Sequence, residues 1–403
     1  MRSLHSAVKK GAALLIAMSV TGVILEAAIR LVKPQLTYSR LLAMTGDQYA
    51  PGKCIPFTLR PGYTARQPSQ EYPGKWAKVT INKRGFRGKE FSLEKKLGAV
   101  RILVLGDSYT FGVYVNDDET YPAVLESALN RRGINAEVIN AGYADGWSPD
   151  EHYAWLVNEG LRYKPDVIIY GFFIGNDITD LAPKHWASLN AQGLPERIEN
   201  PDIYIDSLGR IRSKVPDAKT VGINRVYRIP FLRESHLLVF LALRLDDVIW
   251  RISKRKDFWG NDPFPFILKK QNDSVNDQQQ ELFLRLVKGM KIVAEHQQAQ
   301  FLMMEIPINF QLDPTLMRKL MGKQMPIARD YFAEIAPALD GMGIRYLNLL
   351  EKMKENPGIY YPRNGEVHFN PSGNRFAGEQ LAQYLLASGV LGPLRQNGTE
   401  EGK

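Results

Sequence analysis

The sequence predicts an α/β protein in which helices cover both faces of a parallel β-sheet. Short apolar runs of strand length alternate along the chain with longer segments whose apolar residues recur at helical spacing. Two of the runs, Arg101–Leu105 and Asp166–Phe173, are almost wholly apolar, as strands buried on both faces are. Strand–helix alternation is typical of parallel sheets, so polar groups that follow the strands are expected to meet at the carboxyl edge of the sheet.

Five strands and the intervening helices are expected in chain order. The predicted strands are Arg101–Leu105, Ala136–Asn140, Asp166–Phe173, Phe301–Ile306 and Ile344–Asn348. The predicted helices are Tyr121–Arg131, Asp150–Leu161, Asp277–Glu295, Met325–Leu339 and Ser372–Leu386. Roughly a hundred residues separate the third and fourth strands, far more than a usual connection. Residues 181–276 are therefore predicted to form an inserted subdomain or lid, with Ser235 as the cap of a helix that runs to about Arg255.

Composition narrows the class of protein. The 403 residues are 44% hydrophobic and 24% charged, which fits a folded globular chain. Cys54 is the only cysteine, so an intrachain disulfide framework and a multi-cysteine metal site are excluded, and six scattered histidines suggest no built-in metal. The net charge of +9 favours anionic surroundings. The basic clusters Lys83–Lys89 and Arg251–Lys256 lack the interleaved aromatic residues of a nucleic-acid platform, so a membrane surface or a polyanionic substrate is the better partner.

The amino terminus carries an apolar run that extends over residues 11–28. As a helix this run would span roughly 27 Å, enough for a thin bilayer, and Glu26 lies near the end where a carboxylate can reach the headgroups. A cleaved signal peptide is the alternative, but Glu26 then stands where cleavage after Ala28 requires a small residue. We favour an uncleaved, single-pass anchor in the cell inner membrane. The weak excess of basic residues before the span predicts that the body faces the periplasm or the exterior.

These features divide the chain into four expected parts. They are an anchor over residues 1–35, a polar juxtamembrane segment over 36–98, the α/β domain over 99–390 with the insertion at 181–276, and a disordered tail over 391–403.

Residues suited to acyl transfer follow the predicted strands. Ser108 stands in the sequence GDSYTFG after the first strand, and a glycine-containing loop, NAGYADGWS, begins at Asn140 at the end of the second. Asn176 follows the third strand in Gly-Asn-Asp, and His368 precedes the last helix in GEVHFNPSG. A serine nucleophile, a histidine base, and backbone and carboxamide donors are the groups that acyl transfer requires. Each motif alone is common in ordinary turns and caps, but their joint occurrence at successive strand ends is unlikely by chance.

The chain therefore resembles the SGNH (GDSL-type) hydrolases over residues 100–181 and 277–387. The segment Ile81–Gly88 is similar to the corresponding part of membrane-anchored bacterial members of that family. The resemblance implies a flavodoxin-like three-layer sandwich with strand order 2-1-3-4-5, and no cofactor.

The same resemblance implies roles for individual residues. Ser108 would be the nucleophile and His368 the general base. The oxyanion hole would consist of the Ser108 N–H, a glycine N–H from the second motif and the Asn176 side chain. We choose Gly146 as that glycine because GWSPDEH resembles the stretch that follows it in the family. Gly142 stays open, because Gly146 lies one residue later than usual relative to Asn140.

The third member of the triad departs from the family pattern. Many members place an aspartate two or three residues before the histidine, whereas this chain has Glu366 and Gly365 there. Glu366 can still accept the second imidazole N–H, so we predict a Ser108–His368–Glu366 triad. The alternative is a Ser–His dyad whose histidine binds a backbone carbonyl.

The expected reaction is the hydrolysis of an O-acyl ester on a carbohydrate or lipid at the cell envelope, through an acyl-serine intermediate. An O-acyltransferase that modifies an exported polysaccharide would use the same residues and is the alternative. A catalytically idle, envelope-binding scaffold is a second alternative. The expected partners are an acylated glycan or lipid and the inner membrane, with no nucleic acid, no cofactor and no metal. The sequence does not predict an oligomeric state.

Overall fold

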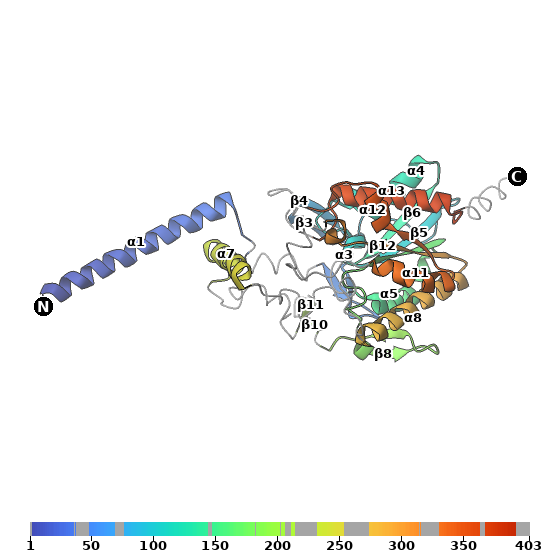
Figure 1. Cartoon of the computed structure of the whole chain (residues 1–403), viewed down its shortest axis with the longest axis horizontal. Helices are drawn as coiled ribbons and strands as arrows, with labels where there is room; N and C mark the ends of the chain where they lie inside the picture. The colour runs from blue at the N-terminus through green and yellow to red at the C-terminus, as the bar shows by residue number, and fades with distance from the viewer. Residues whose placement is uncertain are drawn as a thin grey trace. The chain divides into compact units, whose positions relative to one another are not determined.

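The computed structural model forms two compact units, residues 1–47 with 202–260 and residues 48–201 with 261–403, which are considered separately (Figure 1). The described residues are 2–35, 37, 48–68, 76–143, 147–181, 183–201, 203–205, 211–213, 232–253, 274–313, 315, 330–362 and 367–391.

The larger unit is built on a five-stranded sheet with the order β13-β12-β7-β5-β6, in which every neighbouring pair is parallel. The strands are β5 (Val100–Gly106), β6 (Ala136–Gly142), β7 (Val167–Phe173), β12 (Gln300–Ile306) and β13 (Arg345–Asn348). Renumbered in chain order, the arrangement is 2-1-3-4-5, so the expected strands and their order are confirmed. The strands β5 and β7 are buried along their whole length, which explains their nearly continuous apolar sequence.

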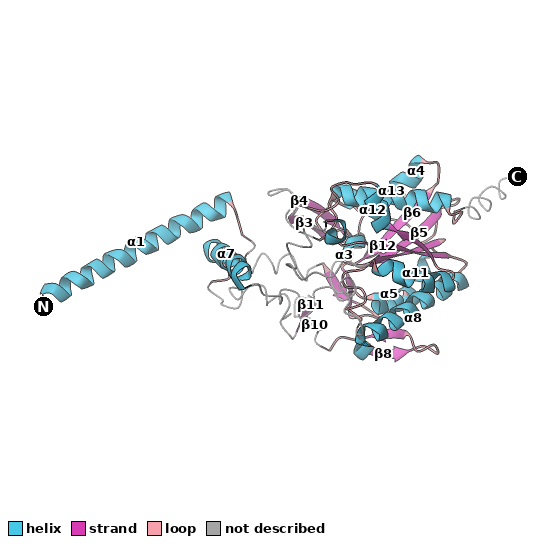
Figure 2. Ribbon diagram, viewed as in Figure 1, coloured by secondary structure: helices cyan, strands magenta, loops and turns pink. Residues whose placement is uncertain are grey.

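Helices cover both faces of this sheet, as Figure 2 shows. On one face α4 packs against α13, and on the other α5 packs against α8. The helices of this unit are α3 (Ser108–Phe111), α4 (Tyr121–Arg131), α5 (Pro149–Asn158), α8 (Ser274–His296), α9 (Asn309–Leu312), α11 (Tyr331–Gly341), α12 (Leu349–Glu355) and α13 (Pro371–Ala387). The predicted three-layer α/β architecture is therefore confirmed.

Two predicted helices have different bounds in the structure. The helix expected over 150–161 ends at Asn158 and is followed by the 3-10 helix η2 (Gly160–Tyr163), which closes at Lys164 in the left-handed region. The helix expected from Met325 is observed from Tyr331, capped by Asp330, and residues 325–329 lie outside the described part.

The juxtamembrane residues 48–98 pack on the α/β unit. They contain two antiparallel pairs, β1 (Tyr49–Pro51) with β2 (Phe57–Leu59) and β3 (Thr64–Pro68) with β4 (Trp76–Thr80). An isolated bridge joins Arg87 to Asn140 of β6, and the Trp147 indole N–H donates to the Phe57 carbonyl at 3.3 Å. The Cys54 thiol is buried here, and that burial raises its pKa to about 11. These contacts make the segment part of the unit that carries the sheet.

The predicted insertion is divided between the two units. The hairpin of β8 (Trp186–Leu189) and β9 (Pro195–Ile198) packs against α5 in the larger unit. Residues 202–260, which include α7 (His236–Ser253), belong to the smaller unit. The expected end of the insertion, residue 276, falls in the first turn of α8, while residues 254–273 and the expected tail, apart from Leu391, lie outside the described residues.

The smaller unit joins the amino-terminal helix to α7. Within α1 (Arg2–Val32), residues Lys9–Val32 are long and apolar enough to cross a membrane, a property that signal sequences share. The Glu26 carboxylate accepts the backbone N–H groups of His236 and Leu237 at 3.0 and 2.7 Å. It also accepts the Ser235 hydroxyl at 2.8 Å, and the same hydroxyl accepts the Leu238 N–H at 3.1 Å. Ser235 is thus the cap that the sequence predicts, and Glu26 is the second cap of the same helix.

Arg101 is a charged side chain inside the core of the larger unit. Arg101 in β5 has no exposed surface and pairs with Glu137 of β6 at 2.7 Å. Its guanidinium also donates to the carbonyl oxygens of Ser92, Leu93, Glu94 and Tyr163. Because the buried guanidinium bonds three consecutive carbonyl groups, Arg101 fastens residues 92–94 to the start of the sheet.

We expect Arg101→Met to lower the free energy of unfolding by about 3–5 kcal/mol, since it leaves Glu137 as an uncompensated buried charge. Urea denaturation followed by tryptophan fluorescence measures this change. The control is Arg131→Met, which removes an exposed arginine paired with Glu379 and is expected to cost about 1 kcal/mol or less. An equally small loss for Arg101→Met would contradict this account of the core.

Candidate active site

Ser108 stands at a sharp turn between β5 and α3. Gly106 has φ +152°, and a Cβ atom there would lie 2.1 Å from the Thr110 hydroxyl and 2.8 Å from the Gly171 carbonyl oxygen. Only glycine fits this position. The Asp107 carboxylate then caps the helix by accepting the Tyr109 N–H at 3.0 Å. Ser108 is the first residue of α3, so its N–H has no partner within the helix and is available to a ligand.

His368 meets Ser108 from the other end of the chain. Ser108 Oγ and His368 Nε2 are 2.9 Å apart, although 260 residues separate them in sequence. For Nε2 to accept the serine proton, the neutral ring must carry its own proton on Nδ1. The structure thus brings together the nucleophile and the base that the sequence predicts.

The loop that carries His368 is held by aromatic and capping contacts. The Tyr109 hydroxyl donates to the Val367 carbonyl oxygen, and the Tyr109 ring lies 5.1 Å from the imidazole. The Tyr114 ring lies on another side, edge to face, at 5.8 Å. Asn370 ends the loop by capping α13, with its Oδ1 accepting the Gly373 N–H at 2.8 Å. These contacts hold the imidazole over the start of α3.

Asn176 follows the strand next to that of Ser108. The parallel register pairs Gly106 with Gly171, so the turns after β5 and β7 lie at the same edge of the sheet. The Asp177 carboxylate accepts the Tyr170 hydroxyl at 2.8 Å and the Phe173 N–H at 3.0 Å, and these bonds close the turn. Asn176 Nδ2 donates one N–H to Asp180 at 2.8 Å. The second amide N–H of Asn176 can therefore serve as a donor at this edge.

The two glycine candidates differ in what the structure shows. The Gly142 N–H donates to the Asn140 side-chain oxygen at 2.9 Å and is already engaged. A Cβ atom on Gly142 would lie 2.2 Å from the Phe111 backbone nitrogen, so this glycine permits β6 to approach α3. Gly146 lies in residues 144–146, outside the described part, and Glu366 likewise lies in residues 363–366. Their roles stay predictions.

Buried carboxyl groups surround the histidine and the turn of Asn176. Burial raises the pKa of Asp107 to about 6, against smaller opposing effects of the Tyr109 N–H and of nearby His368. Burial also raises the pKa of Asp177 well above its usual range, and the neighbouring Asp107 adds to that rise. Among the described residues, no group of three or more histidine, cysteine or acidic side chains could hold a metal ion.

The sequence does not reveal the role of two residues at this site, and the first of them is Arg87. Its side chain is buried against the Phe111 ring, with the guanidinium carbon 4.6 Å from the ring centre. The guanidinium donates to the carbonyl oxygens of Phe111 (2.9 Å), Gly112 (2.6 Å) and Val115 (2.6 Å) and pairs with Asp117 (3.2 Å). Burial lowers the pKa of Arg87 to about 10, so the group stays charged at neutral pH. Arg87 therefore fixes the carboxyl end of the short helix that begins with Ser108.

Tyr109 is a second such residue. It stands inside the GDSYTFG motif, and its position next to Ser108 is the signal that could have identified it. Arg87 lies between glycines in a segment that resembles membrane-anchored relatives, but a basic residue in a polar segment gives no sign of burial.

No family model matches the chain, and no curated protein matches it. Solved structures do match. They include a lipase/acylhydrolase from Enterococcus faecalis (12% identity, 72% of this chain and 96% of that chain, TM-score 0.37). Another is an acetyl xylan esterase, AlAXEase (16% identity, 72% of this chain and 99% of that chain, TM-score 0.36). A third is the psychrotrophic esterase EstA from a Pseudoalteromonas species (11% identity, 72% of this chain and 97% of that chain, TM-score 0.34). Because these likenesses are distant, we rest the functional assignment on the chain's own sheet order and side-chain geometry.

We expect Arg87→Met to increase amide hydrogen exchange at Phe111 and Gly112 by about tenfold or more, because each lost carbonyl contact is worth about 1 kcal/mol. Mass-spectrometric exchange on the peptide that contains α3 measures this. Arg131→Met is the control, since it removes an exposed arginine of α4, and it should leave the exchange of this peptide unchanged. The same protection in wild type and Arg87→Met would show that Arg87 does not hold α3.

Proposed function

We propose that this chain is a serine ester hydrolase of the SGNH (GDSL) type, with Ser108 as the nucleophile. The observation that carries the proposal is the 2.9 Å contact between Ser108 Oγ and His368 Nε2 at the carboxyl edge of the parallel sheet. A serine hydroxyl at a helix start, hydrogen-bonded to an imidazole, is the arrangement that activates serine for attack on a carbonyl carbon.

The reaction would proceed in two halves. His368 takes the Ser108 proton as Oγ attacks the ester carbonyl, and the imidazolium then returns the proton to the leaving alcohol. Water, deprotonated by His368, then attacks the acyl-serine carbonyl, and the bond to Ser108 Oγ breaks as the imidazolium returns the proton to Oγ and the carboxylic acid is released. The oxyanion of each tetrahedral intermediate would accept hydrogen bonds from the Ser108 N–H, the Gly146 N–H and Asn176. Loss of one such donor costs on the order of 3 kcal/mol.

Glu366 is proposed as the acid that orients His368. It lies two residues before the histidine in sequence, a spacing that would let its carboxylate accept a hydrogen bond from the Nδ1–H group. That bond would fix the tautomer in which Nε2 faces Ser108.

The proposed substrate is an O-acyl ester of a glycan or lipid at the cell envelope. Helix α1 supports this location, because residues Lys9–Val32 could hold the larger unit at the inner membrane, with the site in the periplasm or outside the cell. The net charge of +9 supports an anionic environment.

An O-acyltransferase is the second candidate, favoured by the same apolar helix, which would keep the site next to exported polysaccharide. The two functions differ only in the acceptor that resolves the acyl-serine. An idle scaffold is disfavoured, because an inactive protein has no need of a serine–imidazole contact at a glycine-dependent turn.

We expect Ser108→Ala to lower kcat for acetylated glycans and for 4-nitrophenyl acetate by about 10⁴-fold or more. The matched control is Ser127→Ala, an exposed serine on α4, which should retain full activity. Product analysis with and without an added sugar acceptor separates the two reactions, since a transferase yields acylated sugar instead of free acid. Hydrolysis that persists in Ser108→Ala would refute the assignment of the nucleophile.

We expect Glu366→Ala to lower kcat by about 10⁴-fold if Glu366 orients His368, as removal of a triad acid does. Glu366→Asp, which restores the carboxylate usual in the family, should retain most of the activity. A loss of only a few-fold in Glu366→Ala would exclude the triad and support the dyad.

A further inference from the structure

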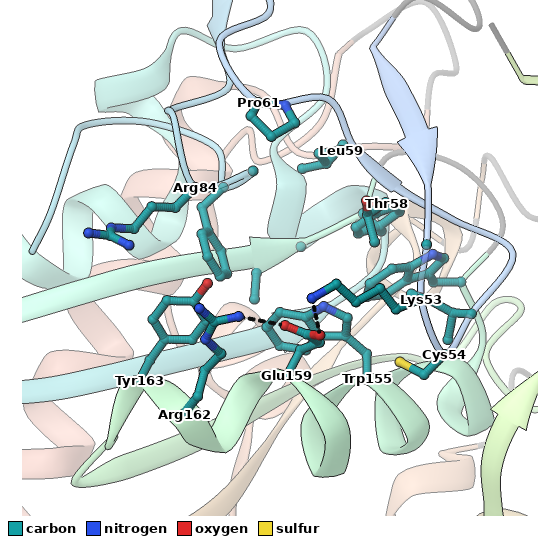
Figure 3. Close-up of a pocket in the computed structure, with 18 of the residues that line it drawn as sticks. Lys53, Cys54, Thr58, Leu59, Pro61, Arg84, Trp155, Glu159, Arg162 and Tyr163 are labelled. Carbon is teal, nitrogen blue, oxygen red and sulfur yellow. Dashed lines mark hydrogen bonds and ion pairs between the residues drawn. The ribbon is translucent and has the colours of Figure 1, made fainter. Parts of the chain in front are cut away.

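A cavity of about 380 Å³ lies in the larger unit, between the juxtamembrane segment and α5 (Figure 3). Residues between 51 and 61 and residues 83–86 form one side, and residues of α5 and η2 form the other. Ala141, Gly142 and Tyr143 line it where β6 ends. Its volume is typical of a site for a small ligand. Neither Ser108 nor His368 lines the cavity, so it is a separate compartment from the proposed catalytic pair.

Positive charge predominates around this cavity. The lining contains four cationic side chains, Lys53, Lys83, Arg84 and Arg162. Glu159 is the carboxylate among the lining residues, and it pairs with Lys53 at 3.3 Å and with Arg162 at 2.9 Å, as the dashed lines in Figure 3 show. Among the described residues, no carboxylate forms an ion pair with the Lys83 ammonium or the Arg84 guanidinium, although the Glu90 carboxylate accepts the Lys83 backbone N–H at 2.9 Å. Both of these side chains are exposed and can receive an anion without breaking an existing pair.

Aromatic rings form the inner wall. Phe86 packs edge to face against Tyr163 at 5.0 Å and against Trp155 at 5.8 Å. The three residues are only 3–7% exposed, so the rings present edges and small areas to the cavity. Stacking of a nucleobase requires an open ring face, which these rings do not offer. A fatty acyl chain would contact the rings but carries no group that would use the cations of the lining.

Two residues that flank positions 144–146 in the sequence belong to the lining of the cavity. Tyr143 and Trp147 stand at the two ends of residues 144–146, and their rings stack with centroids 3.4 Å apart and planes 8° apart. Both residues line the cavity. Gly142 lines it as well and lies against the backbone of Thr110 and Phe111 in α3. An occupant would therefore touch both ends of this loop and the strand that supports α3.

We propose that this cavity binds a negatively charged sugar unit, with its anionic group at Lys83 and Arg84 and its ring against Trp155 and Tyr163. The hydroxyl oxygens of a sugar suit the electropositive edges of these rings, and its anionic group suits the cationic rim. The cavity would hold a unit of an acidic glycan beside the catalytic edge of the sheet. The site stands on its own residues and does not require Ser108 to be a nucleophile.

Binding to the full-length chain in detergent tests this proposal, with isothermal titration and the fluorescence of the cavity tryptophans as readouts. The probes are digalacturonate, glucose 6-phosphate and neutral maltose. We expect one or both anionic sugars to bind at least about tenfold more tightly than maltose, since a charge-assisted hydrogen bond is worth about tenfold or more. A preference for the uronate or the phosphate identifies the anionic group.

Two variants separate the cavity from general surface charge. Lys83→Gln with Arg84→Gln removes two exposed cations and should weaken binding by about tenfold or more. The matched control is Lys96→Gln with Lys288→Gln, which removes the same charge from exposed positions outside the cavity and should leave binding within about twofold. Thr58→Trp keeps every charge but fills the cavity from the β2 side, and should abolish binding.

The proposal is overturned if maltose binds as tightly as both anionic sugars, or if the two double variants weaken binding equally. It is also overturned if binding survives in Thr58→Trp. Vesicles of phosphatidylglycerol provide the last arm. Vesicle binding that depends on Lys83 and Arg84, with no sugar binding, would make this surface a membrane contact instead of a sugar site.

Discussion

The contact between the Ser108 hydroxyl and the His368 imidazole is the interaction on which the structure's chemistry depends. It joins groups 260 residues apart at 2.9 Å, so both the β5–α3 turn and the loop before α13 must be fixed. Gly106 permits the turn, because no side chain fits between Thr110 and the neighbouring strand. Tyr109 links the two segments directly, since its hydroxyl binds the Val367 carbonyl and its ring faces the imidazole. The Gly106 turn and the Tyr109 contacts, both close to Ser108 in sequence, therefore position the two side chains on the sheet.

The juxtamembrane residues take part in this assembly. Arg87 holds the carboxyl end of α3, and residues 92–94 are bound through Arg101 to the other end of the sheet. The same segment forms one wall of the cationic cavity, whose floor is the end of β6. The described residues of the segment 48–98 thus contact α3 at the carboxyl edge of the sheet and β5 at its opposite end. In a chain whose first helix could cross a membrane, the segment that follows this helix in sequence also supports Ser108, the proposed nucleophile.

The sequence predicts the sheet well because buried parallel strands leave a strong apolar signal and their ends carry the polar motifs. Ser108, His368 and Asn176 could be found for that reason. Arg87 could not, because a basic residue in a polar segment is normally solvated, and its burial depends on carbonyl groups that only the folded helix presents. The hydrogen bond that engages the Gly142 N–H could not be predicted either, and the role of Gly146 stays a prediction. The sequence also could not show that residues 202–260 belong to the unit of the first helix, because that packing involves Glu26, which caps a helix more than two hundred residues away.

The most direct test of the central claim is to find which residue an activated phosphonate labels. The full-length chain is treated with a fluorophosphonate and digested, and the adduct is located by mass spectrometry. We expect one phosphonylated site, Ser108, and loss of labelling when His368 is replaced by alanine, because the imidazole activates the hydroxyl. Labelling of another residue, or labelling of Ser108 that is equally fast without His368, would contradict it.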